Sequence, residues 1–442
     1  MVMNLETPEP IRSLQKKLYL KAKAEPDFRF YLLYDKVWRE DILEHAYMVA
    51  RANAGAAGVD GVTFPEIDVA GRKEWLSGIG KELRDRSYRP DAVRRVMIPK
   101  PNGGERPLGI PTIRDRVVQT AVKLVIEPIF EADLEPNAYG YRPRRSAGDA
   151  VEAVHDLLRR GYTDVVDADL SKYFDTIPHD QLMRSVARRI VDKDILKLIK
   201  MWLKAPVEET DKDGRKRLTG GKRNKQGTPQ GGVISPLLAN LYMNRFLKHW
   251  RLTEQGHKLK AQVIAYADDF VILSRGHAAE AKAWAGAVMA CLGLSLNEAK
   301  TSLRNAWEER FDFLGYSFGP HYSPRTGRRY LGASPSKKSV ARLKPRLSAI
   351  LRRGNNEPWA DVCSKLNRLL KGWSGYFDYG TCTPAYCAID HHVATRVRRF
   401  LVKRHRVSSH GTRWFSDTTI FGELGVVRLR QLAVRRPPWA LR

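Results

Sequence analysis

The spacing of apolar and polar residues divides the chain into a first part that mixes strands with helices and a second part that is helical. β-Branched and aromatic residues form short runs at 163–169 and 263–273, which is typical of buried strands. Apolar residues at 114–131 and 278–291 instead recur at helical spacing. Beyond about residue 333 the only period is helical. The pattern therefore predicts an α+β fold followed by an α-helical bundle.

Three amphipathic helices are expected in the second part, at 340–350, 359–373 and 389–400, with Arg and Lys on their free faces. The heavily basic residues after 405 are expected to form a tail that contacts nucleic acid. In the first part, residues 180–203 have a helical pattern, and the polar stretch that follows them predicts an exposed basic hairpin or loop.

Three helix starts carry capping signals. Asp41 and Glu44 have the spacing of a capping box, which predicts a helix from Asp41 onward. Ser146 is expected to cap a helix that ends near Gly161. Ser235 is likewise expected to cap a helix, with a proline at the first helical position.

Two adjacent carboxylates, Asp268 and Asp269, are expected at the tip of a hairpin between the strands in 263–273. Neighbouring carboxylates repel each other, so a fold that holds them side by side usually neutralises them with a dication. Asp169 ends a separate strand upstream, and carboxylates from two strand ends are what a two-metal centre for phosphoryl transfer needs. Taken alone, the hairpin is also compatible with a solvated turn.

Residues 93–111 predict a second hairpin, with its turn at 101–104. This places Lys100 and Arg106 near one another, where a cationic pair would grip a triphosphate. A basic surface hairpin is the alternative for this stretch alone. In the loop before Ser235, glycines allow the backbone to approach a ligand closely.

The chain has 442 residues, which suits two or three domains, and 77 Lys and Arg against 49 Asp and Glu give a formal charge of +28. This imbalance favours nucleic acid as a partner, with a merely basic protein as the alternative. The acidic start is not a signal peptide, and the longest apolar runs are too short to span a membrane. Four cysteines fit a reducing compartment, so a cytoplasmic protein is expected.

Several strings resemble the catalytic motifs of reverse transcriptases, and more specifically of those encoded by bacterial group II introns. They are Arg-Pro-Leu-Gly-Ile-Pro at 106–111, the segment from Asp167 to Asp175, Pro-Gln-Gly at 229–231 and Tyr-Ala-Asp-Asp at 266–269. The resemblance covers roughly residues 40–430. It implies a right-hand polymerase fold, in which fingers and palm with an antiparallel sheet precede a thumb. The expected domains are an N-terminal extension with a template-covering loop (1–62), fingers and palm (63–332), the thumb, maturase or X domain (333–405) and the basic tail (406–442).

The resemblance also implies roles for individual residues. Asp169 and Asp268, with the Leu170 carbonyl, would bind two Mg²⁺ ions, and Asp269 would support the site. Phe174 matches a position whose ring excludes a 2′ hydroxyl, and Gln230 would position the nascent base pair. Lys100 and Arg106 would hold the nucleotide phosphates, and the expected nucleic-acid contacts are Arg142, Arg144, Arg145, Tyr266 and Gly315.

For the loop at 137–146, which alternates aromatic and arginine side chains, a turn with a solvated charge cluster competes with nucleic-acid binding. For Gly315, near the turn that resembles a primer-contacting segment, a packed edge strand competes. Cys382, Cys387, His391 and His392 match no common zinc-finger spacing, so no zinc is expected.

The expected function is RNA-directed DNA synthesis, combined with binding of group II intron RNA to assist splicing and intron mobility by target-primed reverse transcription. The expected partners are intron RNA, target DNA with its primer, and dNTPs. The sequence does not decide between a monomer and a homodimer. No HNH endonuclease domain is expected, and the bacterial protein would associate with the nucleoid when it acts on DNA. Two alternatives remain: an RNA-binding maturase that needs no polymerase activity, and a domesticated reverse transcriptase in phage defence or beside a CRISPR array.

Overall fold

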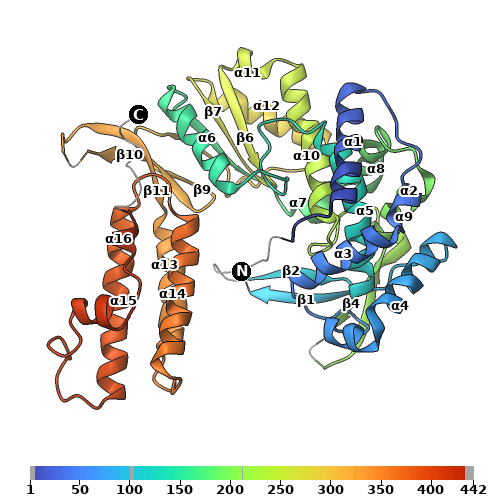
Figure 1. The fold of residues 1–442 in the computed structure, drawn as a ribbon. Coiled ribbons are helices and arrows are strands. Elements are labelled where there is room, and N and C mark those ends of the chain that lie inside the picture. Colours follow the sequence, from blue (N-terminus) through green and yellow to red (C-terminus); the bar gives the residue numbers. More distant parts are fainter. Residues whose placement is uncertain (1–4, 100–103, 212, 324, 434–442) are drawn as a thin grey trace.

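A computed structural model describes residues 5–99, 104–211, 213–323 and 325–433 of the chain (Figure 1). Helices and strands alternate through its first three quarters, and the last quarter is helical. The α+β class with a C-terminal helical bundle is therefore confirmed.

Four strands form one antiparallel sheet, here termed the palm sheet, in the order β6, β7, β3, β8. They are β3 (Asp164–Asp169), β6 (Ala261–Tyr266), β7 (Asp269–Ser274) and β8 (Ser302–Asn305). The two central strands, β7 and β3, are the two apolar runs that the sequence pattern identified, and both pair along their full length.

Both faces of the palm sheet are covered, because successive side chains of a strand point to opposite faces. Val166 on one face joins a large core with α10 (Ser235–Leu252) and α12 (Ala278–Cys291). Its neighbour Val165 joins a separate core with α6 (Ala147–Arg159) on the other face. Burial on both faces explains the continuous apolar run from Phe270 to Leu273 in β7 and the adjacent Val165 and Val166 in β3.

A second sheet, the fingers sheet, has the order β2, β1, β4, β5. Its strands are β1 (Val93–Pro99), β2 (Glu105–Ile110), β4 (Pro206–Thr210) and β5 (Lys216–Gly220). Both expected hairpins are present, and the turn of the first lies outside the described residues. One pairing departs from the expected antiparallel arrangement, because β1 and β4 run parallel.

The N-terminal segment is built into the fingers and does not form a separate extension. Ile11 and Leu18 of α1 (Glu9–Ala24) are buried in the same core as α5 (Ile113–Glu131), and Gln15 donates a hydrogen bond to the Leu124 carbonyl at 3.0 Å. The fingers also contain α2 (Tyr34–Val37), α3 (Glu40–Ala52), α4 (Phe64–Arg84), α7 (Tyr173–Thr176), α8 (His179–Ala187) and α9 (Lys193–Leu203).

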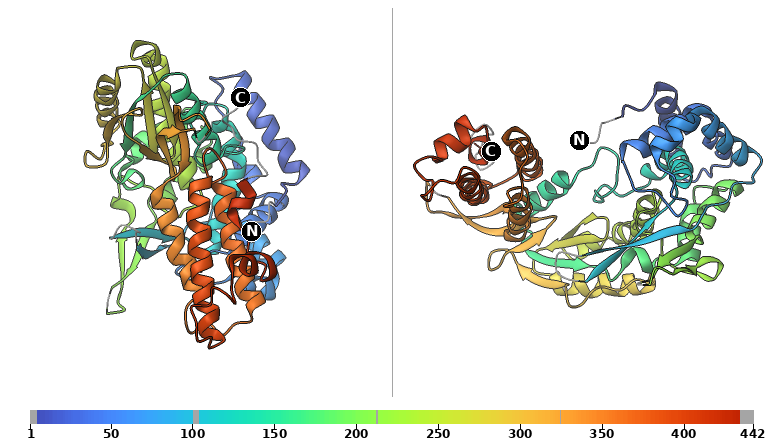
Figure 2. Two further views of the ribbon diagram at one scale, coloured as in Figure 1. Left: turned by 90° about the vertical axis from the view of Figure 1, so that its left-hand side faces the viewer. Right: turned by 90° about the horizontal axis from the view of Figure 1, so that it is seen from below.

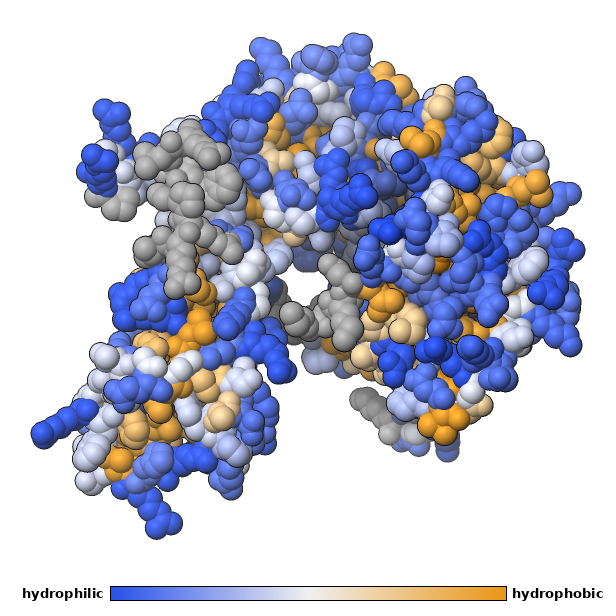
Figure 3. Space-filling view, viewed as in Figure 1, coloured by the Kyte–Doolittle hydropathy of each residue, from blue (hydrophilic) through white to orange (hydrophobic). Residues whose placement is uncertain are grey.

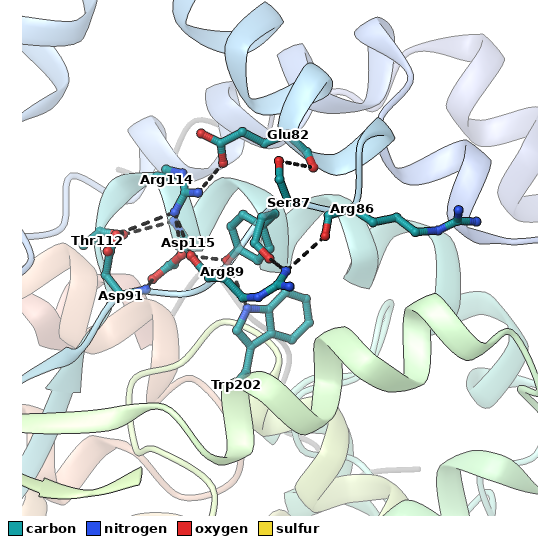
Figure 4. Close-up of polar contacts among 10 residues, drawn as sticks. Glu82, Arg86, Ser87, Arg89, Asp91, Thr112, Arg114, Asp115 and Trp202 are labelled. Atoms are coloured by element: carbon teal, nitrogen blue, oxygen red, sulfur yellow. Dashed lines mark hydrogen bonds and ion pairs between the residues drawn. The ribbon is translucent and has the colours of Figure 1, made fainter. Parts of the chain in front are cut away.

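A buried polar network fixes the start of the fingers sheet against α5 and α9 (Figure 4). Asp115 accepts a hydrogen bond from the Tyr88 hydroxyl at 2.6 Å and another from the Asp91 backbone at 3.0 Å. The Trp202 indole donates to the same Tyr88 hydroxyl at 3.2 Å. Arg114, which pairs with Glu82, covers the Tyr88 ring. The network holds segments together that are far apart in sequence.

The third sheet and the helical bundle complete the chain. The sheet is β9 (Phe311–Phe313), β10 (Tyr316–Tyr322) and β11 (Arg329–Pro335), in the order β11, β10, β9. The three expected helices are α13 (Lys337–Ile350), α14 (Trp359–Tyr376) and α15 (Thr383–Arg404), followed by a short π-helix (Thr419–Glu423) and α16 (Leu429–Ala433).

The expected boundary after residue 405 is wrong for the part of the tail that the structure describes. Ile420, Val426 and Leu429 are fully or almost fully buried in the core of the bundle. Asp390 of α15 accepts hydrogen bonds from the backbone amides of Leu429 and Arg430. The tail up to Ala433 is therefore part of the bundle, because its few apolar residues fill the groove between α14 and α15.

Two of the three capping predictions are wrong. Asp41 pairs with Arg39 and Glu44 with Arg72, so neither caps α3. Ser235 is the first residue inside α10 and therefore does not cap it from outside. Its hydroxyl accepts a hydrogen bond from the Thr228 hydroxyl at 2.7 Å. The Ser146 capping box is confirmed, with Asp149 as its partner.

The bundle stands at one side of the molecule and the fingers at the other, with the palm sheet between them (Figures 1 and 2). The space-filling view shows a wide notch between the bundle and the fingers (Figure 3). None of the described helices is both long and apolar enough to cross a lipid bilayer.

Candidate active site

The palm sheet brings the three predicted carboxylates together. In the antiparallel pairing of β3 with β7, Asp169 lies directly opposite Asp269, and on the other side of β7 Asp269 lies opposite Tyr266. Asp268 occupies the tight turn between β6 and β7, next to Ala267, whose φ of +59° is left-handed. Cross-strand neighbours have Cβ atoms about 5 Å apart, so Asp169 and Asp269 lie beside each other, and both repel the adjacent Asp268.

The loop at 137–141 supports this turn from behind. Tyr139 donates its backbone amide to the Ala265 carbonyl at 2.8 Å, and Asn240 of α10 donates to the Gly140 carbonyl at 2.6 Å. A Cβ on Gly140 would lie 2.5 Å from the Ala267 nitrogen. Glycine is therefore required where this loop meets the hairpin that carries the acids.

Burial and mutual repulsion disfavour full ionisation of the acidic cluster. Partial removal from water, followed by repulsion from Asp268, Asp169 and Asp167, raises the pKa of Asp269 to about 7. Burial also raises the pKa of Asp268, with a further contribution from Asp169. For Asp167, burial is again the main cause, and its pKa rises to about 6.

Asp167 was not among the predicted site residues, although a simple signal identifies it. It lies two residues before Asp169 on β3, and residues two apart on a strand face the same side. Arg304 on β8 and Asp312 on β9 are its main charged neighbours. It extends the negative field of the cluster along the sheet.

Lys300 and Asn297 also belong to the site and were not predicted. The Lys300 ammonium lies 2.9 Å from Asp169 Oδ2, and the Asn297 amide donates to the same oxygen at 3.2 Å. The hydrogen bond to Asp169 is the main cause of a raised pKa at Lys300. These residues precede β8, and only the tertiary structure brings them beside Asp169.

The donor set fits a hard divalent cation. Carboxylates that repel one another are stabilised by a positive charge, and oxygen donors are the ligands that Mg²⁺ prefers. The Lys300 ammonium already supplies one positive charge at Asp169. Within the described ranges, no three His, Cys, Asp or Glu side chains converge closely enough to form a finished metal site. Leu170, the predicted carbonyl ligand, is buried and forms a β-bridge with Leu296.

The predicted nucleotide-binding residues Arg106 and Gln230 are in contact. Arg106 Nε donates to Gln230 Oε1 at 2.7 Å, and the Gly109 amide donates to the Gln230 carbonyl at 2.6 Å. A Cβ on Gly231, whose φ is +108°, would collide with the Gly109 carbonyl. The loop at 226–232 is thus joined to β2 over the palm. Lys100 lies outside the described residues.

Phe174 lies at the base of this loop. Its carbonyl accepts a hydrogen bond from the Thr228 amide at 2.7 Å, and its ring packs edge-on against Tyr173. The side chain is buried, with 5% of the residue exposed. Its predicted role in excluding a 2′ hydroxyl stays a prediction.

The arginines of the loop at 137–146 divide into two kinds. The Arg142 side chain is only 5% exposed, pairs with Glu131 at 2.7 Å and donates to the carbonyls of Glu135 and Ala138. Its guanidinium is satisfied inside the protein, and the predicted nucleic-acid contact of Arg142 stays a prediction that this packing disfavours. Arg144 and Arg145 are exposed and remain available for such a contact.

Tyr266 and Gly315 occupy different surroundings. The half-buried Tyr266 ring lies 6.5 Å from that of Tyr141, centroid to centroid. Gly315 has a φ of +81° and joins the palm to α13, because its carbonyl accepts hydrogen bonds from Ser339 and from the Ser336 amide. A contact between either residue and nucleic acid stays a prediction.

Two of the four rejected zinc ligands, Cys382 and His392, have other partners. Cys382 donates to the Tyr379 carbonyl at 3.1 Å, and His392 Nε2 lies 3.1 Å from the Ser348 hydroxyl. None of the four cysteines forms a disulfide bond in the described structure.

Comparison with known proteins now identifies the chain. A family model described as reverse transcriptase (RNA-dependent DNA polymerase) matches residues 98–318, which include the whole acidic cluster. The chain belongs to the reverse transcriptase family. This reverse transcriptase also matches the group II intron, maturase-specific domain at residues 340–417, within the helical bundle. It is an RNA-directed DNA polymerase by family, and the predicted enzyme class is confirmed.

The relatives include proteins encoded by introns. The reverse transcriptase is 34% identical to protein YkfC of Escherichia coli over 343 residues, which cover 69% of this chain and 87% of YkfC. It is 32% identical over 241 residues to the group II intron-encoded protein LtrA of Lactococcus lactis, covering 54% of this chain but only 38% of LtrA. A telomerase structure from Candida albicans covers 82% of this chain and 69% of its own at 12% identity, with a TM-score of 0.42, which is too low to add to the assignment.

Proposed function

We propose that this reverse transcriptase copies RNA into DNA at the cluster of Asp169, Asp268 and Asp269, with two Mg²⁺ ions. The observation that supports the proposal best is the cross-strand pairing of Asp169 with Asp269 inside the segment that matches the family. The Leu170 carbonyl would complete the ligand set. When bound, the ions would activate the primer 3′ hydroxyl and neutralise the pyrophosphate leaving group.

The residues around the cluster would hold the other reactants. Arg106 would bind the triphosphate of the incoming dNTP, while its hydrogen bond to Gln230 keeps both side chains oriented. Lys100, on the same hairpin, would add a second positive charge. Phe174 would limit the space beside the sugar. Such fixed groups lower the barrier because they need no reorganisation during the reaction.

The test is primer extension on poly(rA)/oligo(dT) with dTTP and Mg²⁺. Asp268→Asn should lower the extension rate by roughly 10²–10³-fold or more, because it removes a charged ligand without changing the side-chain shape. RNA binding should stay within a few-fold. Asp213→Asn, which changes an exposed carboxylate in the β4–β5 turn, is the matched control and should extend normally. Normal extension by Asp268→Asn would refute the metal assignment.

A second role is binding of group II intron RNA to assist its splicing, and it is favoured by the maturase-specific match over the helical bundle. In this role the basic bundle would stabilise the folded intron, and the polymerase would then copy the intron from a primer in target DNA. Splicing of the flanking RNA by wild type and by Asp268→Asn separates the two roles. Splicing should survive the substitution, whereas a domesticated enzyme of phage defence or a CRISPR array would have no flanking intron RNA to splice.

A further inference from the structure

A basic pocket lies on the side of the fingers that is remote from the helical bundle. Helices α8 and α9 and the segment 224–225 enclose a cavity of about 720 Å³. Both helices lie at the edge of the molecule opposite the bundle (Figure 1). The residues that line this cavity include none of the acidic cluster of the palm. The volume is within the usual range for a small-molecule or nucleotide site, roughly 300–1,000 Å³.

Lysines dominate the rim of the cavity. Lys193, Lys197 and Lys200 follow one another along one stripe of α9, because residues three or four apart share a helix face, and Lys204 comes directly after the end of the helix. Lys225 faces them from the neighbouring segment. The only acidic lining residue is Asp180, so five lysines and one aspartate leave a net charge of +4.

Four of these lysines are exposed and can bind an anion. Lys193, Lys197, Lys200 and Lys225 are exposed, and none of them forms an ion pair with a carboxylate within the part of the chain that the structure describes. The opposite face of α9 is buried, with Ile195 and Trp202 in the core. A stable helix therefore presents a row of unpaired positive charges over a concave surface.

The floor of the cavity is apolar, with one polar exception. Met183, Leu196 and Leu203 line it. His179 is only 7% exposed, and its Nε2 lies 2.6 Å from the Gly227 carbonyl. Its other ring nitrogen, Nδ1, is buried and forms no hydrogen bond of good geometry in the described structure, although the Asn224 backbone also acts on the ring and opposes the lowering of its pKa by burial. A buried polar atom of this kind is costly unless a partner reaches it.

We propose that this pocket binds one nucleotide unit of a single-stranded RNA, with the phosphates on the lysines and the base on the apolar floor. The proposal rests on the RNA-binding role proposed above and assigns it a second contact surface, outside the catalytic cleft. Charge complementarity selects a polyanion, and the concave apolar floor favours a base over a purely ionic ligand. His179 would give the floor one polar group to meet a base edge.

The first test compares two charge-matched double variants in binding to fluorescein-labelled oligo(rU) over a salt series. Lys197→Gln with Lys200→Gln should weaken binding several-fold and lower the salt slope by about 1.4, since single strands contribute about 0.7 per phosphate contact. Lys258→Gln with Lys260→Gln alters two exposed lysines on the palm and is the control. Equal affinities and slopes for the two double variants would overturn the proposal.

The second test locates the base. A photo-crosslinking amino acid at Leu196, on the floor, should crosslink to oligo(rU), and the same group at the exposed Leu252 should not. UMP added as a competitor at the same concentration as the oligonucleotide should not remove the crosslink at position 196. Its removal would overturn the proposal, because it would indicate a site for free nucleotides. At saturating poly(rA)/oligo(dT), the extension rate should be unchanged in the lysine variant. A wild-type protein that does not extend this primer would instead contradict the proposed polymerase function.

Discussion

At the scale of single residues, the raised pKa of Asp269 links the protonation of the palm cluster to the binding of a cation. Asp269 has a pKa of about 7, so near neutral pH its carboxyl exchanges a proton that a dication would displace. Lys300 offsets part of the repulsion: its ammonium pairs with Asp169 at 2.9 Å, and its charge also acts on Asp268 and Asp269. The repulsion that remains at Asp268 and Asp269 is what the proposed metal ions would remove.

Asp115 allows a separate prediction about stability. Burial raises its pKa from 3.8 to about 6, against the opposing hydrogen bond from Tyr88. A carboxyl with a raised pKa binds its proton more tightly in the folded state, so the stability that it contributes is present below about pH 4 and is lost as pH rises through about 6. The shift corresponds to roughly 3 kcal/mol.

Asp115→Asn should therefore be destabilised by different amounts at different pH. The variant loses an acceptor for Tyr88 or Asp91 at every pH, but its deficit relative to wild type should be largest near pH 4 and smaller above pH 6. Urea unfolding of both proteins over this pH range measures the difference. Parallel curves would show that Asp115 does not titrate as described.

At the scale of elements, the β6–β7 hairpin depends on a loop that is distant in sequence. Its tip holds Asp268 and Asp269, and the loop at 137–141 fixes it through Tyr139 and Gly140. The hairpin strands are specified by their own residues, whereas the position of the tip depends on this packing. The catalytic geometry is therefore sensitive to a residue that bears no functional group.

Gly140→Ala tests this dependence. Its Cβ would lie 2.5 Å from the Ala267 nitrogen and 2.9 Å from the Tyr266 carbonyl carbon, and backbone cannot give way as a side chain can. We expect primer extension to fall by about tenfold or more, since small misplacements of catalytic groups are costly. Gly78→Ala, in an open position on α4, is the control and should keep full activity with equal or slightly higher stability. Similar extension rates in the two variants would contradict the role of the loop.

At the scale of the whole molecule, the relation of the bundle to the palm depends on a narrow joint. The segment that links α14 to α15 packs on the β10–β11 sheet, where the Thr381 amide donates to the Ala333 carbonyl at 2.7 Å. The Tyr316 hydroxyl donates a hydrogen bond to the Tyr376 carbonyl, and the Tyr376 hydroxyl donates one to the Leu314 carbonyl. These contacts, together with those of Gly315 with Ser336 and Ser339, connect the bundle to the palm beside the notch.

Gly380→Ala should weaken this joint. Gly380 has a φ of +72°, and its Cβ would collide with the Ala333 carbonyl. We expect shorter products in a single-binding extension assay with a heparin trap, together with a lower melting temperature, because the bundle would hold the template less firmly. Gly372→Ala on α14 has open space around it and serves as the control. Equal product lengths from the two variants would contradict the role of the joint.

The sequence by itself determined the local elements and the chemical identity of the site. Hairpins, amphipathic helices and the Ser146 cap follow from periodicity and from hydrogen bonds between residues a few positions apart. The motif strings indicated that Asp169 and the pair at 268–269 belong to one centre. Side chains whose partners are local, or whose motif is long, are therefore predictable.

Only the tertiary structure decided which charges are satisfied inside the protein and which face solvent. Arg142 pairs with Glu131 and Lys300 with Asp169, whereas Lys193, Lys197 and Lys200 of α9 form no ion pair with a carboxylate in the described structure. The tail up to Ala433 also became part of the bundle through contacts with helices tens of residues away. The physical reason is that burial and ion pairing depend on distances in space, which the order of residues along one chain does not specify.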